Sequence, residues 1–345
     1  MKKQILILIF FSMASFVIYG QSSSLQIVDV HDHLSGWLFK GSGDGYEKAA
    51  EIAIKTMDKL KVGKMILMPT PQTVGQENPH TFDAYLAVIK KYPDRFILLG
   101  GGGTLNVMIQ QAVKDGKVSE EMKMNFTNKA KELLANGVKG FGEMAAEHLS
   151  MNAEHPYMTA PPDHPLFLLL ADIAAEADVP IDLHMEAVQN DMKLPARLKS
   201  FPNNPAIIKQ NIPQFEKLLM HNRKAKIIWD HAGWDNTGQR TTELMNKLLK
   251  VHPNLYISIR VVSRNIPGRP TDENNKIKAD WAKLINTYPD RFMIGSDEFF
   301  LPFEKREHPS SESIDNTIGF LDELSPEIAA LVSYKNAEKI FNIKK

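Results

Sequence analysis

The chain has 345 residues, and its 41 basic side chains are balanced by 41 acidic ones, so the formal net charge at pH 7 is zero. The basic residues are spread along the sequence, which excludes the basic stripe or patch that a nucleic-acid-binding surface needs. There is no cysteine, which excludes disulfides and lipid attachment through a cysteine. A chain of this length can bury enough apolar surface to fold without disulfides.

The first residues have the layout of a targeting segment rather than of a folded element. The basic start "MKKQ" is followed by the apolar run "ILILIFFSMASFVIYG" and then by the polar "QSSS". The apolar run is shorter than the roughly 20 residues that span a bilayer comfortably, and this order is typical of a cleaved secretory signal. We therefore expect residues 1–20 to be removed and the protein to be exported, periplasmic or secreted, without a stable membrane anchor. An uncleaved anchor is the alternative.

From residue 25 to residue 345 the sequence repeats one pattern, in which an amphipathic helical stretch is followed by a short apolar run and a polar or glycine-rich loop. Strands are expected over residues 26–34, 64–70, 95–103, 138–144, 180–186, 226–234, 255–261 and 291–300. The helical stretches between them cover residues 46–63, 80–94, 127–137, 164–179, 214–225, 241–254 and 278–290.

Strands that alternate with helices pair in parallel, and eight such units predict an α/β fold, a closed (β/α)8 TIM barrel in a single domain. The alternative is an open, doubly wound sheet, but no G-x-G-x-x-G loop follows the first strand. Long connections are expected over residues 104–125, 145–164, 186–212 and 261–278. In a barrel these loops all emerge at the C-terminal face, where active sites lie.

Potential metal ligands gather at the ends of the expected strands. The first strand, "IVDVHDHL", places His31 and His33 on the same side, because side chains alternate along a strand. The fourth, fifth, sixth and eighth strands reach Glu143, His184, His231 and Asp297. Imidazole and carboxylate groups are ligands of zinc and related divalent metals. Because a buried ring of such groups would be costly without an ion, the sequence predicts a metal site.

This ordered set of residues resembles the pattern of the amidohydrolase superfamily, with His-x-His after strand one, His after strands five and six, and Asp after strand eight. The most similar branch is the amidohydrolase-related (amidohydrolase 2) group, which also contains metal-dependent decarboxylases. The resemblance covers essentially the whole mature chain. It includes the closing segment "LSPEIAALVSYKNAEKIFNI", in which a helix leads into an Asn-Ala pair and an apolar end.

The resemblance implies a role for each strand-end residue. His31 and His33 bind the more buried ion together with Asp297, which also acts as general base towards metal-activated water. His184 binds the same ion or a second one. His231 binds a second ion or holds substrate and water. The implied cofactor is zinc or a similar divalent metal, present as one or two ions.

The fourth strand leaves the number of ions open. Some members of the superfamily carry a carboxylated Lys there, but Lys139 lies at the start of the strand, about 13 Å nearer the wrong end. Glu143 lies at the mouth, where it either bridges two ions or holds a ligand histidine in its tautomer. His148, His155 and His164, in the loop that follows, are expected to lie mostly at the surface.

Two further residues are candidates for substrate binding. Arg260 ends the seventh strand, where its guanidinium either clamps a substrate carboxylate or phosphate or pairs with Glu143 or Asp297. Trp37 follows His33 by a few positions and either walls the pocket or packs.

The sequence thus predicts an exported hydrolase that uses metal-activated water on a small ester, lactone or amide. One alternative is a metal-dependent, non-hydrolytic decarboxylase of an aromatic or unsaturated acid. The other is a non-catalytic barrel that binds a metal or ligand, against which the complete ligand set argues. The expected partner is a small-molecule substrate and not nucleic acid, and a homo-oligomer is left open.

Overall fold

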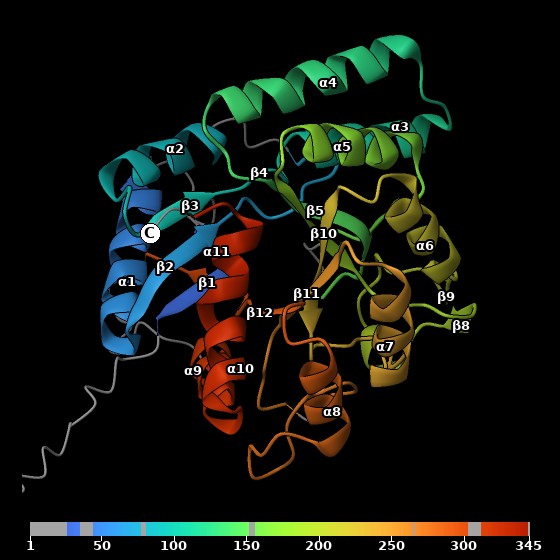
Figure 1. Ribbon diagram of the computed structural model, residues 1–345. Helices are drawn as coiled ribbons and strands as arrows, with labels where there is room; N and C mark the ends of the chain where they lie inside the picture. The colour runs from blue at the N-terminus through green and yellow to red at the C-terminus, as the bar shows by residue number, and fades with distance from the viewer. Residues whose placement is uncertain are drawn as a thin grey trace, which may run out of the picture.

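The computed structural model describes residues 26–34, 44–76, 81–151, 156–264, 266–302 and 312–343. Parallel strands alternate with helices along this chain (Figure 1). The expected signal at residues 1–20, together with Trp37 and His155, lies outside the described residues. No helix within the described ranges is long and apolar enough to cross a membrane.

Each of the eight expected strands is present. They are β1 (Ile27–Leu34), β2 (Val62–Leu67), β3 (Phe96–Leu98) with β4 (Gly100–Gly101), β5 (Phe141–His148), β7 (Pro180–Met185), β10 (Lys226–Ala232), β11 (Leu255–Ile259), and β12 (Phe292–Ile294) with β13 (Glu298–Phe300). The third and eighth strands are each interrupted, and each therefore appears as two short elements. The fourth strand, β5, continues to His148, beyond the expected end at residue 144.

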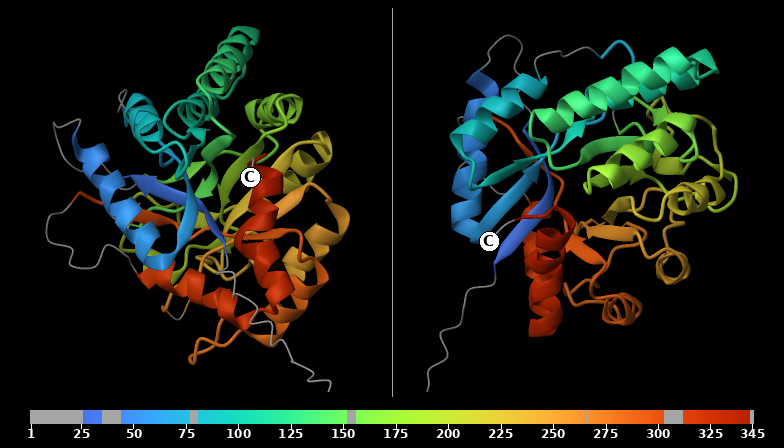
Figure 2. Two further views of the ribbon diagram at one scale, coloured as in Figure 1. Left: turned by 60° about the vertical axis from the view of Figure 1, so that its left-hand side comes forward. Right: turned by 45° about the horizontal axis from the view of Figure 1, so that its top comes forward.

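The two interrupted strands join two parallel sheets into a ring. One sheet has the order β13-β1-β2-β3 and the other the order β12-β11-β10-β7-β5-β4. The Leu99 amide, between β3 and β4, donates to the Leu67 carbonyl at 2.9 Å, and the Asp297 amide, between β12 and β13, donates to the His31 carbonyl at 2.9 Å. The arrangement is consistent with the expected (β/α)8 barrel (Figure 2).

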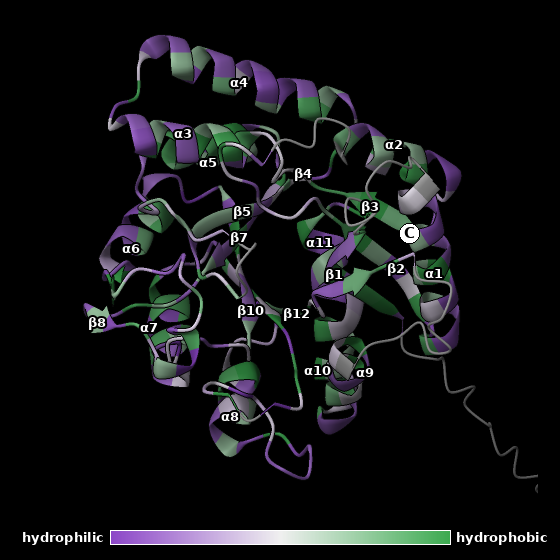
Figure 3. Ribbon diagram, turned by 180° about the vertical axis from the view of Figure 1, so that it is seen from behind, coloured by the Kyte–Doolittle hydropathy of each residue, from purple (hydrophilic) through white to green (hydrophobic). Residues whose placement is uncertain are grey.

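Helices cover the outside of the ring. They are α1 (Asp44–Leu60), α2 (Thr81–Lys91), α3 (Leu105–Asp115), α4 (Glu120–Ala135), α5 (Pro165–Glu176), α6 (Ile212–His221), α7 (Thr242–Val251) and α8 (Ala279–Thr287), followed by α9 (Glu312–Gly319), α10 (Pro326–Ala330) and α11 (Asn336–Ile340). Hydrophobic and hydrophilic residues alternate around them (Figure 3). In α7 the buried residues are Leu244, Met245, Leu248 and Leu249, which is the spacing of one helix face.

The connection expected as a long loop over residues 104–125 is instead largely helical. Gly116, at a φ of 65°, ends α3 in the left-handed conformation that glycine adopts readily. The Ser119 side chain then accepts a hydrogen bond from the Met122 amide and begins α4. The expectation was wrong because polar side chains interrupt the apolar spacing of this stretch, although the capping residues mark both helix ends.

The inside of the ring is a separate apolar core. It contains Val28, Val30, Ile66, Met68, Leu99, Ile228 and Met293 from the strands, packed against Ala337, Ile340 and Phe341 from the C-terminal segment. The closing segment singled out in the sequence therefore covers the ring interior. Asn336, in its Asn-Ala pair, donates through Nδ2 to the carbonyls of Pro289 (2.8 Å) and Phe292 (2.9 Å) and so ties α11 to β12.

Replacement of Asn336 by Ala should destabilise the fold without altering the strand ends at the opposite mouth. Two buried carbonyls would lose their donor, which typically costs about 1–3 kcal/mol in the free energy of unfolding. Urea unfolding measures this change. The control is Asn286→Ala, because Asn286 is exposed and bonds only within its own helix to the Ala282 carbonyl. Equal losses in the two variants would contradict the role of Asn336.

Candidate metal centre and active site

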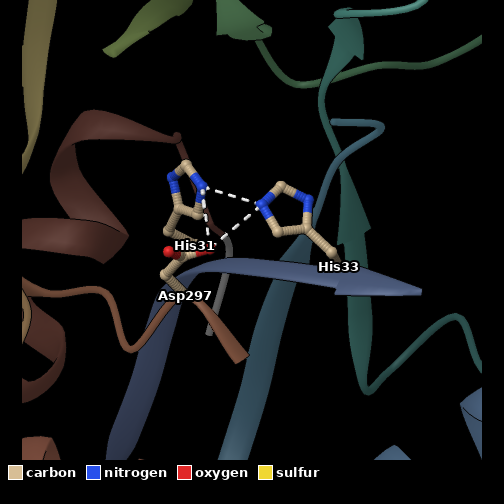
Figure 4. A group of neighbouring side chains, drawn as sticks. All are labelled: His31, His33 and Asp297. Atoms are coloured by element: carbon tan, nitrogen blue, oxygen red, sulfur yellow. Dashed lines mark hydrogen bonds and ion pairs between the residues drawn. The ribbon is translucent and has the colours of Figure 1, made fainter. Parts of the chain in front are cut away.

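The six predicted strand-end side chains come together at one mouth of the ring. His31 and His33 come from β1. The other four come from four further strands: Glu143 from within β5, His184 and His231 from near the ends of β7 and β10, and Asp297 from the interruption between β12 and β13. Figure 4 shows His31, His33 and Asp297 pointing toward one another. These side chains are buried except for His184, whose side chain is 15% exposed.

The Nδ1 atoms of the two β1 histidines each face a hydrogen-bond acceptor. His33 Nδ1 lies 2.8 Å from the Met68 carbonyl oxygen, which can only accept, so this nitrogen carries the proton. His31 Nδ1 lies 3.1 Å from Asp182 Oδ1 and 3.9 Å from Asp230 Oδ2. In the neutral imidazole these contacts leave the lone pair on Nε2 of both rings.

The two Nε2 atoms of His31 and His33 face each other at 3.1 Å. Two lone pairs at this distance repel unless a positive charge lies between them. Two carboxylate oxygens complete the cluster: Asp297 Oδ1 is 3.3 Å from His33 Nε2, and Glu143 Oε2 is 3.4 Å from the same atom. Ligands of one tetrahedral zinc lie about 3.3 Å apart, given bond lengths near 2.0–2.2 Å. The donor set and spacing therefore fit a divalent ion.

Glu143 lies between two groups of histidines. Its Oε2 faces His33 and, at 3.7 Å, His31. Its Oε1 accepts from His184 Nδ1 at 2.7 Å and lies 3.6 Å from His231 Nε2. The geometry therefore suits both alternatives that the sequence left open, a carboxylate bridge and an acid that holds the His184 ring.

The backbone is strained at two of the candidate ligands. His231 has a φ of 59° and Asp297 a φ of 52°, in the left-handed region that residues other than glycine rarely adopt. Such conformations cost about 1–3 kcal/mol and cluster at functional sites. His231 Nδ1 is also buried and has no hydrogen-bond partner within the described part of the chain. The surrounding fold thus holds an imidazole in place at a local cost.

The charges of the cluster are strongly coupled. Burial raises the pKa of Glu143, but hydrogen bonds from His184, His231 and His31 outweigh it and hold that pKa well below its usual range. Burial also opposes ionisation of Asp297, yet other interactions, led by the charge of Arg260, outweigh it and lower the pKa of this carboxyl. Both carboxylates are therefore ionised at neutral pH.

The two buried imidazoles respond in opposite directions. Burial lowers the pKa of His231 to about 3, only partly offset by the charge of Asp297. Burial lowers the pKa of His31 as well, but Asp182, Glu143 and Asp230 outweigh it and raise that pKa well above 6.5. The centre of the cluster thus attracts one positive charge, which either a proton or a metal ion can supply.

Arg260 lies at the same mouth and is already engaged. Its guanidinium contacts Asp297 Oδ2, its Nε donates to Ser313 Oγ at 3.3 Å, and it lies 4.4 Å from the centre of the Trp234 ring. Of the alternatives stated for Arg260, the structure displays the pairing with Asp297. Trp37, the other candidate for substrate binding, lies outside the described residues.

Sequence reasoning missed three residues at the site. Asp182 and Asp230 hold His31, and the first could have been found because it precedes His184 by two positions on a strand and so shares its face. His148 was expected in a surface loop, but it is buried, 4.3 Å in ring-centre distance from His184. His164 instead caps α5 by accepting from the Leu166 amide.

The chain matches the family model of the Amidohydro_2 amidohydrolases over residues 28–343 and belongs to this family. It is therefore an enzyme of the hydrolase type. The match spans β1 to the closing segment, so it covers every strand that supplies a candidate ligand. A search of curated protein sequences finds no match.

Solved structures share the fold at low sequence identity. The chain is similar to a probable 2-pyrone-4,6-dicarboxylic acid hydrolase from Acinetobacter baumannii crystallised with citric acid (TM-score 0.52, 15% identity, 92% of this chain and 100% of that one). It is also similar to a variant of a PTE-like lactonase from Deinococcus radiodurans (TM-score 0.51, 15% identity, 92% of this chain and 96% of that one). A third similar structure is a variant of an organophosphorus hydrolase from Deinococcus radiodurans (TM-score 0.52, 14% identity, 92% of this chain and 93% of that one).

Acidification of the chelator-treated protein should draw a destabilising contribution from His231 between pH 6.5 and about pH 3. In this window the unfolded chain protonates His231 at its usual pKa of 6.5, whereas the folded chain stays neutral there until about pH 3. At this residue the unfolded state then binds more protons, so the contribution of His231 to the free energy of unfolding rises with pH across the window and falls as acid is added.

Urea unfolding of wild type and His231→Gln at several pH values measures this linkage. The variant should show a shallower dependence on pH between about 4.5 and 6.5, where Glu143 and Asp297 contribute little. Parallel curves for the two proteins would contradict the buried, neutral state of His231.

Proposed function

We propose that the protein is a metal-dependent hydrolase that cleaves a small ester, lactone or amide with water, on a (β/α)8 barrel. The observation that carries the proposal is the pair of Nε2 atoms of His31 and His33, 3.1 Å apart with Nδ1 of each ring held by an acceptor. Zinc is the ion that this set of imidazoles and carboxylates suits best. A bound divalent ion would acidify water and polarise a substrate carbonyl.

Asp297 is the proposed general base. Its carboxylate is ionised and buried at 9% exposure, with Oδ1 directed at His33 and Oδ2 at Arg260. It can accept the proton of the attacking water and pass it to the leaving group. Arg260 steadies the charge and orientation of this carboxylate, and a substrate anion that reached Arg260 would compete with Asp297 for the guanidinium.

His231 is the proposed second polar group at the reacting centre. Its ring is neutral, because burial lowers its pKa to about 3. A neutral imidazole can both donate and accept a hydrogen bond, so it can hold water or a substrate oxygen. The left-handed backbone at this residue fixes the ring direction, which is a form of preorganisation.

The proposal extends to where the protein acts. The apolar run before residue 20 supports export and cleavage after Gly20, and the mass of the chain recovered from an expressing cell tests this. A chain that keeps residues 1–20 would contradict cleavage.

Removal of metal should abolish activity, and metal binding should depend on the two β1 histidines. Wild type is expected to hold at least one tightly bound divalent ion, and His33→Ala should bind it much more weakly, because His31 is then the one imidazole left beside the carboxylates of Glu143 and Asp297. Elemental analysis after gel filtration measures the ion. His221→Ala is the control, because His221 lies at the surface and pairs with Asp172. Full activity of metal-free wild type in a chelator would overturn the proposal.

The hydrolytic product should contain one oxygen from solvent. Reaction in ¹⁸O-labelled water followed by mass spectrometry of the product detects it. Asp297→Asn should lower kcat about 10²–10⁴-fold, the usual contribution of general acid–base catalysis. Release of carbon dioxide with no label in the product would instead identify the decarboxylase alternative. In that case the proposed metal site would still hold, but Asp297 would not act as the general base for water.

A further inference from the structure

The loop after β10 carries a buried arginine, Arg240, which the proposed hydrolytic site does not include. Arg240 is 4% exposed, although arginine is rarely buried unless it is paired. Its guanidinium donates through Nη2 to the Met185 carbonyl at 2.5 Å and through Nη1 to the Asp230 carbonyl. Met185 follows His184 in the chain, and Asp230 precedes His231. The two carbonyls that Arg240 contacts are thus next to two of the candidate ligands.

Arg240 joins β7 and β10 at the point where their pairing ends. The last paired residues of the two strands are Leu183 and Trp229. Beyond them, the pairing of β10 with β11 shifts register between Trp229 and Ala232, and the backbone at His231 is left-handed. The regular ladder between β7 and β10 therefore stops short of His231. The guanidinium, a rigid planar fork with several donors, supplies hydrogen bonds that cross this gap.

The guanidinium is itself held by an aromatic ring and by its own loop. Its Cζ lies 4.2 Å from the centre of the Trp229 ring, and Trp229 Nε1 donates to the same Met185 carbonyl at 2.7 Å. The Arg240 amide donates to Asp235 Oδ2 at 2.9 Å, while Asp235 Oδ1 accepts from the Gly238 amide at 2.9 Å. Arg240 therefore has little freedom to move relative to the strand ends.

Three acidic side chains surround the buried positive charge. Burial lowers the pKa of Arg240, and the charges of Glu186, Asp235 and Asp230 oppose this effect. Buried ion pairs are often no more stabilising than apolar side chains of similar volume, because both charges lose their hydration. Stability alone is therefore a poor explanation for a guanidinium at this position, whereas its fixed geometry suits a role in holding the two carbonyls.

We propose that Arg240 is a positioning residue, which sets the spacing of the His184 and His231 rings around one oxygen of Glu143. The ring centres lie 4.9 Å apart. Glu143 Oε1 lies 2.7 Å from His184 Nδ1 and 3.6 Å from His231 Nε2. Functional side chains must be held within about 0.5 Å of their productive geometry. This inference rests on the proposed function of the mouth and adds a residue outside the set of candidate ligands.

Histidine ring signals of the metal-free protein test the proposal without relying on a bound ion. Arg240→Lys keeps the positive charge but replaces the planar fork by a single ammonium group. In NMR spectra of protein labelled with carbon-13 in the histidine rings, the signals of His184 and His231 should shift relative to wild type. The variants His184→Gln and His231→Gln assign these signals. The signal of His221, which lies at the surface and pairs with Asp172, should stay in place.

Arg269→Lys is the matched control for the same change at another buried arginine. Arg269 is 9% exposed and lines the same cavity of about 270 Å³ as Arg240. Its guanidinium donates to the Ser263 carbonyl at 3.0 Å and to Asn275 Oδ1 at 2.7 Å, both within its own loop. Arg269→Lys should therefore leave the signals of the two rings unchanged, even where it lowers the free energy of unfolding.

Affinity for Co²⁺ links the position of the rings to the metal site. Loss of a partner that orients metal ligands typically lowers metal affinity about 10–100-fold. Arg240→Lys should therefore bind Co²⁺ more weakly than wild type by this factor, and Arg269→Lys should match wild type. Arg240→Met, which removes the charge but keeps a long side chain, should shift the same ring signals and serves as the second variant. Circular dichroism establishes that each variant is folded.

Unchanged signals of His184 and His231 in a folded Arg240→Lys or Arg240→Met would overturn the positioning role. Equal shifts of these signals in Arg269→Lys would overturn it too, and so would wild-type affinity for Co²⁺ in a folded Arg240→Lys. Failure of wild type to bind Co²⁺ would instead overturn the proposed function, so the two failures are distinguishable.

Discussion

The close approach of two imidazole nitrogens, His31 Nε2 and His33 Nε2, is the constraint on which the site depends. They lie 3.1 Å apart and are buried, and neither ring can turn away, because Asp182 and the Met68 carbonyl hold the opposite nitrogens. Repulsion between these lone pairs requires a positive charge at the centre. The ionised carboxylates of Glu143 and Asp297 increase that requirement, because they too need a cation when they are removed from water.

The apolar core of the ring of strands stabilises the fold and offsets the cost of this arrangement. Its interior is filled by apolar side chains, and the C-terminal segment covers them, so this core lies apart from the mouth. The strand ends can therefore carry strain, as the left-handed backbone at His231 and Asp297 demonstrates. The same separation explains how one family can retain its fold while loops and ligands at the mouth change.

The two expectations that failed have different physical origins. Residues 104–125 were expected as a loop because polar side chains break the apolar spacing, but Gly116 and Ser119 cap two helices there. His148 was expected mostly at the surface because the strand was thought to end near residue 144. Extension of β5 and its shift of register opposite β7 depend on the neighbouring strand, which a reading of local periodicity does not include.

The sequence by itself determined the eight strands, their parallel order and the six strand-end residues, because these follow from local periodicity and from the alternation of side chains along a strand. Only the tertiary structure decided which atoms face each other. The contact of His31 with Asp182 joins residues 151 positions apart, and the division of the two Glu143 oxygens between His33 and His184 depends on three different strands. Such contacts are set by the closure of the ring and the register between strands, and register is a property of paired strands that no single segment of sequence contains.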